Sequence, residues 1–304
     1  MNQNLQQIDL NLLFVFDMLM QERNLSRAAE RLHKSQPAVS NALSRLREQL
    51  GQPLFRRTAK GLEPTAGAMT LHVPVRQALR LLQAGLAVQE SFQPDTERTF
   101  RLSMNDYGQL RLLPSLMTRL MALAPQVKLQ VLSDEGALIP QRLASGDLDL
   151  AIDYLYFDDA DLLYQPIHEE RLAVIGRPSH PAFREGLDKT AYLAAQHVSL
   201  LPRAGRGSPL EIVLGSAKVQ RHVQLQVPHY LTIPAIVAST DLLGTVPWHL
   251  ARHFVHNYGL QLAELPFETP AVQVSLIWHR QQQHMSGLQW LKEQIAQVAQ
   301  TESS

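Results

Sequence analysis

The sequence contains no cysteine in 304 residues. A chain without cysteine has no disulfide framework, no thiolate nucleophile and no cysteine-ligated zinc site. It also lacks any apolar run of about 20 residues, the length that a helix needs to cross a bilayer. Its first residues, MNQNLQQIDLN, carry no basic side chain ahead of the apolar stretch. We therefore expect no signal peptide, no membrane partner and a cytoplasmic protein.

Net charge is also lacking, since 28 Lys and Arg balance 28 Asp and Glu. The balance hides an asymmetry, because residues 1–92 hold 11 basic and 7 acidic side chains (+4) and the remainder holds 17 and 21 (−4). The stretch from Arg23 to Lys60 contains nine basic residues and only two acidic ones, Glu30 and Glu48. This pattern indicates a basic nucleic-acid-binding module joined to an acidic body.

The most basic region includes residues 24–50, NLSRAAERLHKSQPAVSNALSRLREQL. The pattern predicts two helices joined by a tight polar turn, with Ser35 capping the second helix and Pro37 in its first turn. The second helix has an apolar stripe of Val39, Leu43, Leu46 and Leu50. Its opposite face carries side chains that reach base edges and phosphates, namely Gln36, Ser40, Asn41, Ser44, Arg45 and Arg47. The alternative, an ordinary amphipathic helix pair with a solvated outer face, is less favoured because of the local charge.

A short basic hairpin is predicted directly after these helices, in residues 51–65, GQPLFRRTAKGLEPT. A turn, an extended segment with Arg56 and Arg57, a Lys60-Gly61 turn and a returning segment are typical of a wing. Its basic tip is placed to contact phosphates or the minor groove.

The run AAERLHKSQPAVSNALSRLREQLG, followed by PLFRR and PTAGA, resembles the winged helix-turn-helix of LysR-type transcriptional regulators. The order of elements, the Ser-Gln-Pro helix start and the Leu-Phe-Arg-Arg wing carry the resemblance. We expect residues 1–65 to bind promoter or operator DNA. The expected contacts are Ser35, Gln36, Pro37, Ser40, Asn41, Arg45, Arg56, Arg57 and Lys60.

Residues 66–92 predict one long helix with a single apolar stripe: Leu71, Val75, Leu79, Leu82 and Leu86. A striped helix needs a partner, and a second copy of itself is the simplest one. The alternative is packing against the body of its own chain. The resemblance implies a linker helix that pairs in a homodimer, and a homotetramer as the larger assembly.

Residues 93–304 alternate strand and helix patterns after a polar hinge at 92–98, which predicts parallel sheets covered by helices. The resemblance implies two α/β lobes like those of periplasmic binding proteins, lobe I at about 98–160 and 267–304 and lobe II at about 161–266. The expected fold class is therefore multi-domain: an all-α winged helix-turn-helix, a linker helix and a two-lobed α/β effector domain.

Ligands of α/β sheets bind at the carboxyl ends of strands, and polar or aromatic residues follow several strands here. Each residue alone is explained by a helix cap or a surface loop, but together they favour a cleft for a small-molecule co-inducer. The body also resembles the subgroup of nodulation and aromatic-compound-responsive regulators, which implies an aromatic effector; Asp106 would oppose a carboxylate. The candidates are Ser103, Asn105, Asp106, Tyr107, Asp153, Tyr154, His168, Arg203, His229, Tyr230 and Trp248.

Catalytic motifs are missing: there is no G-x-S-x-G elbow, no phosphate-binding P-loop and no G-x-G-x-x-G after a strand. His249, His253 and His256 share one face of a predicted helix, but no glutamate follows the first histidine and Arg252 repels a cation. We therefore expect no catalytic residue, metal or cofactor. The predicted function is a LysR-type DNA-binding regulator controlled by a small molecule. The alternative is a small-molecule binding protein or enzyme with an accessory DNA-binding head.

Overall fold

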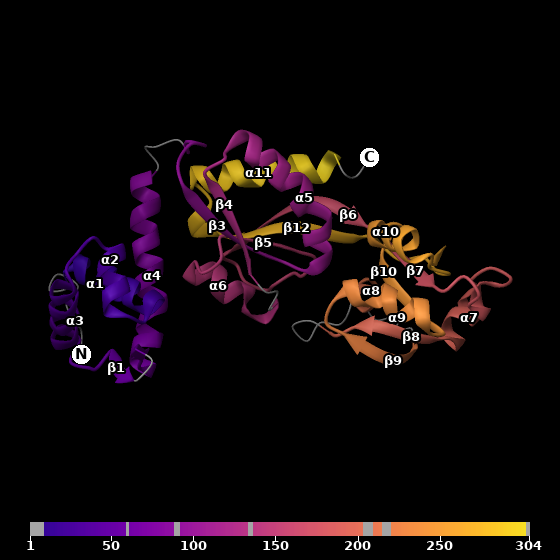
Figure 1. The fold of residues 1–304 in the computed structure, drawn as a ribbon, viewed down its shortest axis with the longest axis horizontal. Coiled ribbons are helices and arrows are strands. Elements are labelled where there is room, and N and C mark those ends of the chain that lie inside the picture. The colour runs from indigo at the N-terminus through magenta and orange to yellow at the C-terminus, as the bar shows by residue number, and fades with distance from the viewer. Residues whose placement is uncertain are drawn as a thin grey trace. The chain divides into compact units, whose positions relative to one another are not determined.

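The computed structural model describes residues 9–58, 61–87, 92–132, 136–202, 209–214 and 220–301. The chain forms two compact units that divide near residue 90. The first holds three short helices, a hairpin and a long helix, and the second holds two sheets with their helices (Figure 1). Within the described residues, no helix is long and apolar enough to cross a membrane.

The first unit is built on three helices, each of which begins at a capping side chain: α1 (Leu10–Glu22), α2 (Leu25–Arg31) and α3 (Gln36–Leu50). The side chains of Asp9 and Asn24 accept hydrogen bonds from the amides that open α1 and α2. Ser35 Oγ accepts from the Ala38 amide at 3.4 Å, so the predicted cap of α3 is present. The apolar face of α3 is buried against α1 and α2 through Val39 and Leu46.

The predicted wing is an antiparallel hairpin of β1 (Phe55–Thr58) and β2 (Gly61–Pro64). Its return strand is fixed to the end of α1, because the Leu62 amide donates to the Arg23 carbonyl at 2.8 Å. Gly61 has a φ of 120°, and a Cβ there would lie 2.7 Å from the Arg23 carbonyl oxygen. Only glycine suits this close backbone approach.

The long helix α4 (Ala66–Ala87) follows the wing, and the first half of its predicted apolar stripe packs on its own unit. Val75 and Leu79 are buried in the core of the first unit, beside Leu12 and Phe16 of α1. The first half of the stripe therefore covers the chain's own small domain, which has too few residues to bury its apolar surface otherwise. Leu82 stays exposed at 44%.

Lobe I of the second unit is a five-stranded sheet with the order β4-β3-β5-β12-β6. Its strands are β3 (Arg98–Met104), β4 (Val127–Leu132), β5 (Leu150–Asp153), β6 (Leu162–Glu170) and β12 (Val272–His279). β3 pairs in parallel with β4 and β5, and β12 runs antiparallel to β5 and β6. Its helices are α5 (Asp106–Leu123), α6 (Ile139–Ser145) and α11 (Ser286–Thr301).

Lobe II is a second five-stranded sheet with the order β11-β7-β10-β8-β9. Its strands are β7 (Leu172–Gly176), β8 (Gln196–Leu200), β9 (His222–Val227), β10 (Leu242–Pro247) and β11 (Gln261–Glu264). Its helices are α7 (Lys189–Ala194), α8 (Pro209–Leu214), α9 (Ile233–Ser239) and α10 (Trp248–Tyr258). The predicted two-lobed α/β architecture is thus confirmed.

The passage between the lobes lies later than predicted. Lobe II was expected from about residue 161, but β6 pairs with β12 from Leu162 to Glu170 and belongs to lobe I. The chain therefore crosses at Arg171 and returns between β11 and β12. Proline is tolerated within β6 because the strand lies at the edge of its sheet, and Pro166 faces an irregularity of the register at Val274 and Ser275.

The predicted hinge at 92–98 is partly anchored. The ring of Phe92 packs 4.8 Å from that of Trp290 on α11 and 6.2 Å from that of Phe100 on β3. Residues from Phe92 onward therefore belong to lobe I. The expected helix from 66 to 92 is described as far as Ala87, and its remaining residues 88–91 lie outside the described part.

Candidate functional site

The candidate DNA-contacting residues lie on the outer face of α3 and on the wing. Gln36, Pro37, Asn41 and Arg45 are exposed and Ser40 is half-buried, while Val39 and Leu46 on the opposite face are buried. Exposed Arg45 has a loose ion pair, 3.8 Å, with Asp9. Arg56 and Arg57 are exposed on β1, and Lys60 lies outside the described residues. The fold thus presents the predicted side chains to solvent on α3 and the hairpin.

A small cavity of about 20 Å³ lies between the two lobes. Six of the predicted effector-binding residues line it: Asn105, Tyr107, Asp153, Tyr154, His168 and Tyr230. Apolar side chains from both sheets complete the wall, among them Leu112, Ile152, Leu172, Val272 and Val274. The cavity is thus mostly apolar, with a few polar groups, the composition typical of a small-molecule site.

Local structure fixes the polar groups of this cavity. Asn105 ends β3 and caps α5, since its Oδ1 accepts from the Gly108 amide at 2.8 Å. Asp153 ends β5, and its Oδ1 accepts from the amides of Tyr154 (2.7 Å) and Leu155 (3.1 Å). Both therefore carry out the capping and turn roles that sequence reasoning weighed as the alternative, while also facing the cavity.

The other predicted residues lie elsewhere. Asp106 and His229 line an outer groove of about 490 Å³, and Asp106 Oδ2 accepts from the Leu231 amide at 2.9 Å. Ser103 is buried in β3 and does not line the cavity. Trp248 begins α10 beneath the guanidinium of Arg171, 5.0 Å from ring centroid to Cζ, in a groove at the lobe crossing. Arg203 lies outside the described residues.

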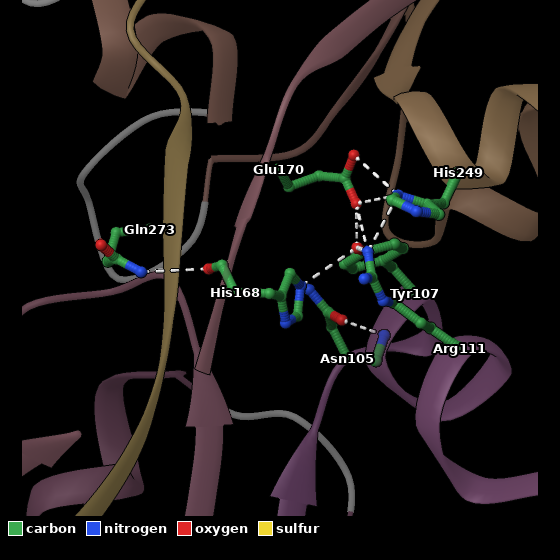
Figure 2. Close-up of polar contacts among 8 residues, drawn as sticks. Asn105, Tyr107, Arg111, His168, Glu170, His249 and Gln273 are labelled. Carbon is green, nitrogen blue, oxygen red and sulfur yellow. Dashed lines mark hydrogen bonds and ion pairs between the residues drawn. The ribbon is translucent and has the colours of Figure 1, made fainter. Parts of the chain in front are cut away.

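Sequence reasoning missed a buried polar network at the base of the cavity, which Figure 2 shows. The centre is an ion pair between Arg111 Nη1 on α5 and Glu170 Oε2 at the end of β6, 2.8 Å apart, with side chains only 4% and 3% exposed. Tyr107 donates its hydroxyl proton to the same Glu170 oxygen. His249 Nδ1 of α10 lies 3.0 Å from Glu170 Oε2 and 2.9 Å from Arg111 Nη1. His168 Nε2 lies 3.3 Å from the Tyr107 hydroxyl.

Burial sets the protonation of two members of the network. Burial raises the pKa of the Tyr107 hydroxyl far above its ordinary value, and the Glu170 carboxylate adds to the effect, so the phenol keeps its proton. Burial, together with the nearby positive charge of Arg111, lowers the pKa of His168 to about 3, so the imidazole is neutral near pH 7. His168 Nδ1 is buried and has no hydrogen-bond partner among the described residues.

Part of this network was visible in the sequence. Arg111 stands four residues after Tyr107, so the two lie on the same helix face, and Glu170 stands two residues after His168, on the same strand face. His249 had been weighed as a metal ligand, but its Nδ1 contacts Glu170 and Arg111, while His253 Nε2 bonds to Asn257 Nδ2 at 2.9 Å. The described residues contain no group of three or more His, Cys, Asp or Glu that could hold a metal.

Comparisons with known proteins match both units. The model of bacterial regulatory helix-turn-helix proteins of the lysR family matches residues 10–69, and that of the LysR substrate binding domain matches residues 94–300. The chain is 34% identical over 296 residues to the HTH-type transcriptional activator NagR of Ralstonia sp, covering 97% of this chain and 98% of the relative. It is 30% identical over 296 residues to nodulation protein D 1 of Bradyrhizobium sp. (strain NC92), covering 96% and 93%.

A solved structure agrees with these matches. The crystal structure of a probable transcriptional regulator from Pseudomonas aeruginosa is 35% identical, covers 96% of this chain and 97% of its own, and superposes with a TM-score of 0.73. The sequence resemblance to the nodulation and aromatic-responsive subgroup is likewise confirmed by the relatives. This chain belongs to the LysR family and is a DNA-binding transcriptional regulator with an effector-binding domain.

Proposed function

We propose that this regulator binds a small aromatic co-inducer in the cavity between its lobes and thereby changes how it binds its operator. The observation that carries the proposal is the composition of the cavity. Three tyrosines, Tyr107, Tyr154 and Tyr230, share its wall with aliphatic side chains of both sheets, and His168 adds a polar atom that has no partner among the described residues. Aromatic walls with few polar groups suit a flat, mostly apolar molecule.

The size of the cavity implies movement. A benzene ring occupies a cavity on the order of 150 Å³, whereas this one measures about 20 Å³. An aromatic effector therefore fits only if the lobes separate or the lining side chains turn. The effector shifts this equilibrium by the difference between its affinities for the two arrangements. We propose that this shift reaches the DNA-binding domain and alters the spacing of the DNA-binding heads.

The effector proposal is tested by a thermal-shift screen of the full chain with phenols and aromatic acids, followed by DNA footprinting. A ligand that stabilises the protein should change the footprint at saturation, and His168→Leu should weaken its binding. His222→Leu, the same change on the exposed strand β9, is the matched control and should leave binding unchanged. An unchanged footprint with the effector saturated would remove the proposal.

We further propose that Gln36, Ser40, Asn41 and Arg45 contact bases or phosphates in the major groove, with Ser35 setting the helix start and Pro37 touching a thymine methyl. Arg56, Arg57 and Lys60 are assigned to phosphates and the minor groove. The exposure of the described members of this set supports the assignment.

Mobility-shift assays separate the two roles. Gln36→Ala should relax sequence preference, with affinity for the operator falling more than affinity for random DNA. Arg56→Ala should weaken binding to all DNA and reduce the salt slope by about 1. Arg252→Ala, an exposed arginine of α10 in the second unit, is the control for general loss of charge. An equal loss on operator and random DNA for Gln36→Ala would count against base reading.

Self-association is part of the proposal. α4 leaves Leu82 exposed beyond the half that packs on its own domain, which supports a homodimer through this helix and a homotetramer in the larger assembly. Sedimentation equilibrium should show Leu82→Glu shifted toward monomer, with Met69→Glu, another exposed apolar position of α4, as control. A Leu82→Glu protein with the mass of the wild type would exclude this contact.

We also propose that the protein is not an enzyme and acts in the cytoplasm, where promoter DNA lies. The alternative is a binding protein or enzyme that carries a DNA-binding head. Incubation of the bound ligand with the full chain separates these, because a regulator returns its effector chemically unchanged.

A further inference from the structure

The hydrogens of the buried network can be assigned by elimination. A carboxylate oxygen only accepts hydrogen bonds, and Glu170 is ionised because it neutralises buried Arg111 at 2.8 Å. The proton between Tyr107 and Glu170 must therefore be that of the tyrosine. A phenol has one proton, so in its other contacts the Tyr107 oxygen accepts. One of these comes from Arg111 Nη1, at 2.9 Å.

The same elimination fixes the tautomer of His168. Its Nε2 lies 3.3 Å from the Tyr107 oxygen, which has no proton left to give, so the imidazole donates from Nε2. His168 is neutral and has a single N–H, which leaves a lone pair on Nδ1. That atom is buried without a partner among the described residues, and the side chain lines the cavity. His168, whose side chain lines the cavity, thus carries a hydrogen-bond acceptor that none of the described residues uses.

The charged groups that line the cavity, Asp153 and Glu170, agree with this polarity. The Asp153 carboxylate is also an acceptor, and it opposes an anion. Asn105 Oδ1 is occupied, since it accepts from the Gly108 amide at 2.8 Å. Arg111 does not line the cavity, and its charge is paired with Glu170. A neutral hydroxyl can donate to His168, whereas a carboxylate would lie near the carboxylates of Asp153 and Glu170, which also line the cavity.

We infer that Glu170 and Tyr107 act as a relay that holds His168 as a hydrogen-bond acceptor toward the cavity, and so select a neutral effector carrying a hydroxyl group. The inference rests on the proposed function, since it assigns the chemistry of the effector in the same cavity. Glu170 is a positioning residue, because it acts through Tyr107.

The first test compares three probes on the full chain by calorimetry: phenol, anisole and benzoate. Phenol donates a hydrogen bond, anisole has the same ring without a donor, and benzoate is an anion. Phenol should bind the wild type at least about tenfold more tightly than anisole, since anisole leaves the buried nitrogen unpaired, and benzoate should bind most weakly. Anisole or benzoate binding as tightly as phenol would overturn the inference.

The second test removes the relay. Tyr107→Phe deletes only the hydroxyl, so His168 can present either nitrogen and the ratio of phenol to anisole affinity should fall toward one. Tyr192→Phe is the matched control, a buried tyrosine of lobe II whose hydroxyl bonds to Thr245 Oγ1 at 2.8 Å, and should keep the wild-type ratio. A Tyr107→Phe protein with an unchanged ratio would refute the relay.

A third readout needs no ligand. Solid-state NMR of the full chain labelled with ¹⁵N-histidine distinguishes protonated from unprotonated ring nitrogens, and the His168 signals are those lost in His168→Gln. An unprotonated Nδ1 in the wild type supports the relay, and a protonated Nδ1 overturns it. If none of the three probes binds, the proposed effector cavity fails, while this measurement still decides the relay.

Discussion

The buried pair of Arg111 and Glu170 allows a quantitative test of what the buried network contributes to stability. Both side chains are more than nine-tenths buried and come from different elements of the second unit, α5 and β6. Glu170→Leu leaves a guanidinium buried without its anion, which costs about 3–5 kcal/mol in unfolding free energy. Arg111→Met leaves the carboxylate with Tyr107 and the half-exposed His249, so we expect the lower end of that range.

The double variant Arg111→Met, Glu170→Leu separates the pair from its surroundings. An apolar pair of similar volume replaces the ion pair at little cost, but Tyr107 and His249 lose partners, at about 1–2 kcal/mol in total. The loss should therefore lie far below the sum of the single variants. The resulting coupling energy is about 4 kcal/mol or more, above the range of about 0.5–3 kcal/mol that is usual for contacting residues.

Urea unfolding followed by tryptophan fluorescence measures the change in unfolding free energy of each variant in the second unit, where the pair lies. The three tryptophans, Trp248, Trp278 and Trp290, all lie in the second unit, so the signal does not report on the DNA-binding domain. Breaking the exposed pair of Arg177 and Asp241 is the control and should cost less than about 1 kcal/mol. Additive single variants, or a double variant worse than either single one, would refute the reasoning.

Three further predictions concern single residues. His197 is fully buried, and burial lowers its pKa to about 4. In the unfolded chain the pKa is near 6.5, so the unfolded state binds a proton more readily than the folded state. The free energy of unfolding is therefore highest above about pH 6.5 and falls with the pH, by about 2 kcal/mol at pH 5. The urea midpoint measured by fluorescence should fall with pH in the same way, and this pH dependence should be weaker in His197→Gln. A wild-type midpoint that does not change with pH would contradict the prediction. Gly61→Ala should destabilise the first unit by about 2 kcal/mol or more, measured by circular dichroism, because its φ is 120° and a Cβ meets the Arg23 carbonyl. Ser35→Ala should cost about 0.5–1 kcal/mol in the same assay, because the cap bond of α3 is long at 3.4 Å, and no change would show that the hydroxyl does not cap the helix in solution.

The DNA-binding domain was predictable because its signals are local. Asn24 and Ser35 cap the helices that follow them, and Gly51 ends α3 with a φ of 64° in the left-handed region. Each of these signals acts within one turn of the chain. The apolar stripe of α4 was equally visible, but the surface that it covers was not, since periodicity marks a buried face without naming its partner.

The lobe boundary was less predictable because strand pairing is not local. Only Arg171 separates β6 from β7, so the sequence from Leu162 to Gly176 shows no turn between the lobes. Which sheet β6 joins is decided by β12, more than 100 residues later. The residues of the candidate site also differ in how predictable they were. Asn105 and Asp153 follow from the rule that ligands bind at strand ends. Arg111 and Glu170 are of residue types that are mostly exposed, and only the fold shows that they are buried together.

The buried network also lies where one helix changes its partner. Leu112, Leu116 and Leu120 of α5 belong to the core of lobe I, whereas Tyr107, at the start of the same helix, is buried in the core of lobe II. Arg111 lies between the part of α5 that packs on lobe II and the part that packs on lobe I. Three residues later, Pro114 lies inside the helix, where it removes one backbone hydrogen bond and makes the helix easier to bend. An effector that widens the cavity must therefore either draw the first turn of α5 out of lobe II or bend the helix before Pro114. Both movements break contacts of Arg111 or Tyr107, so the residues that fix the chemistry of the cavity also set the free energy of opening it.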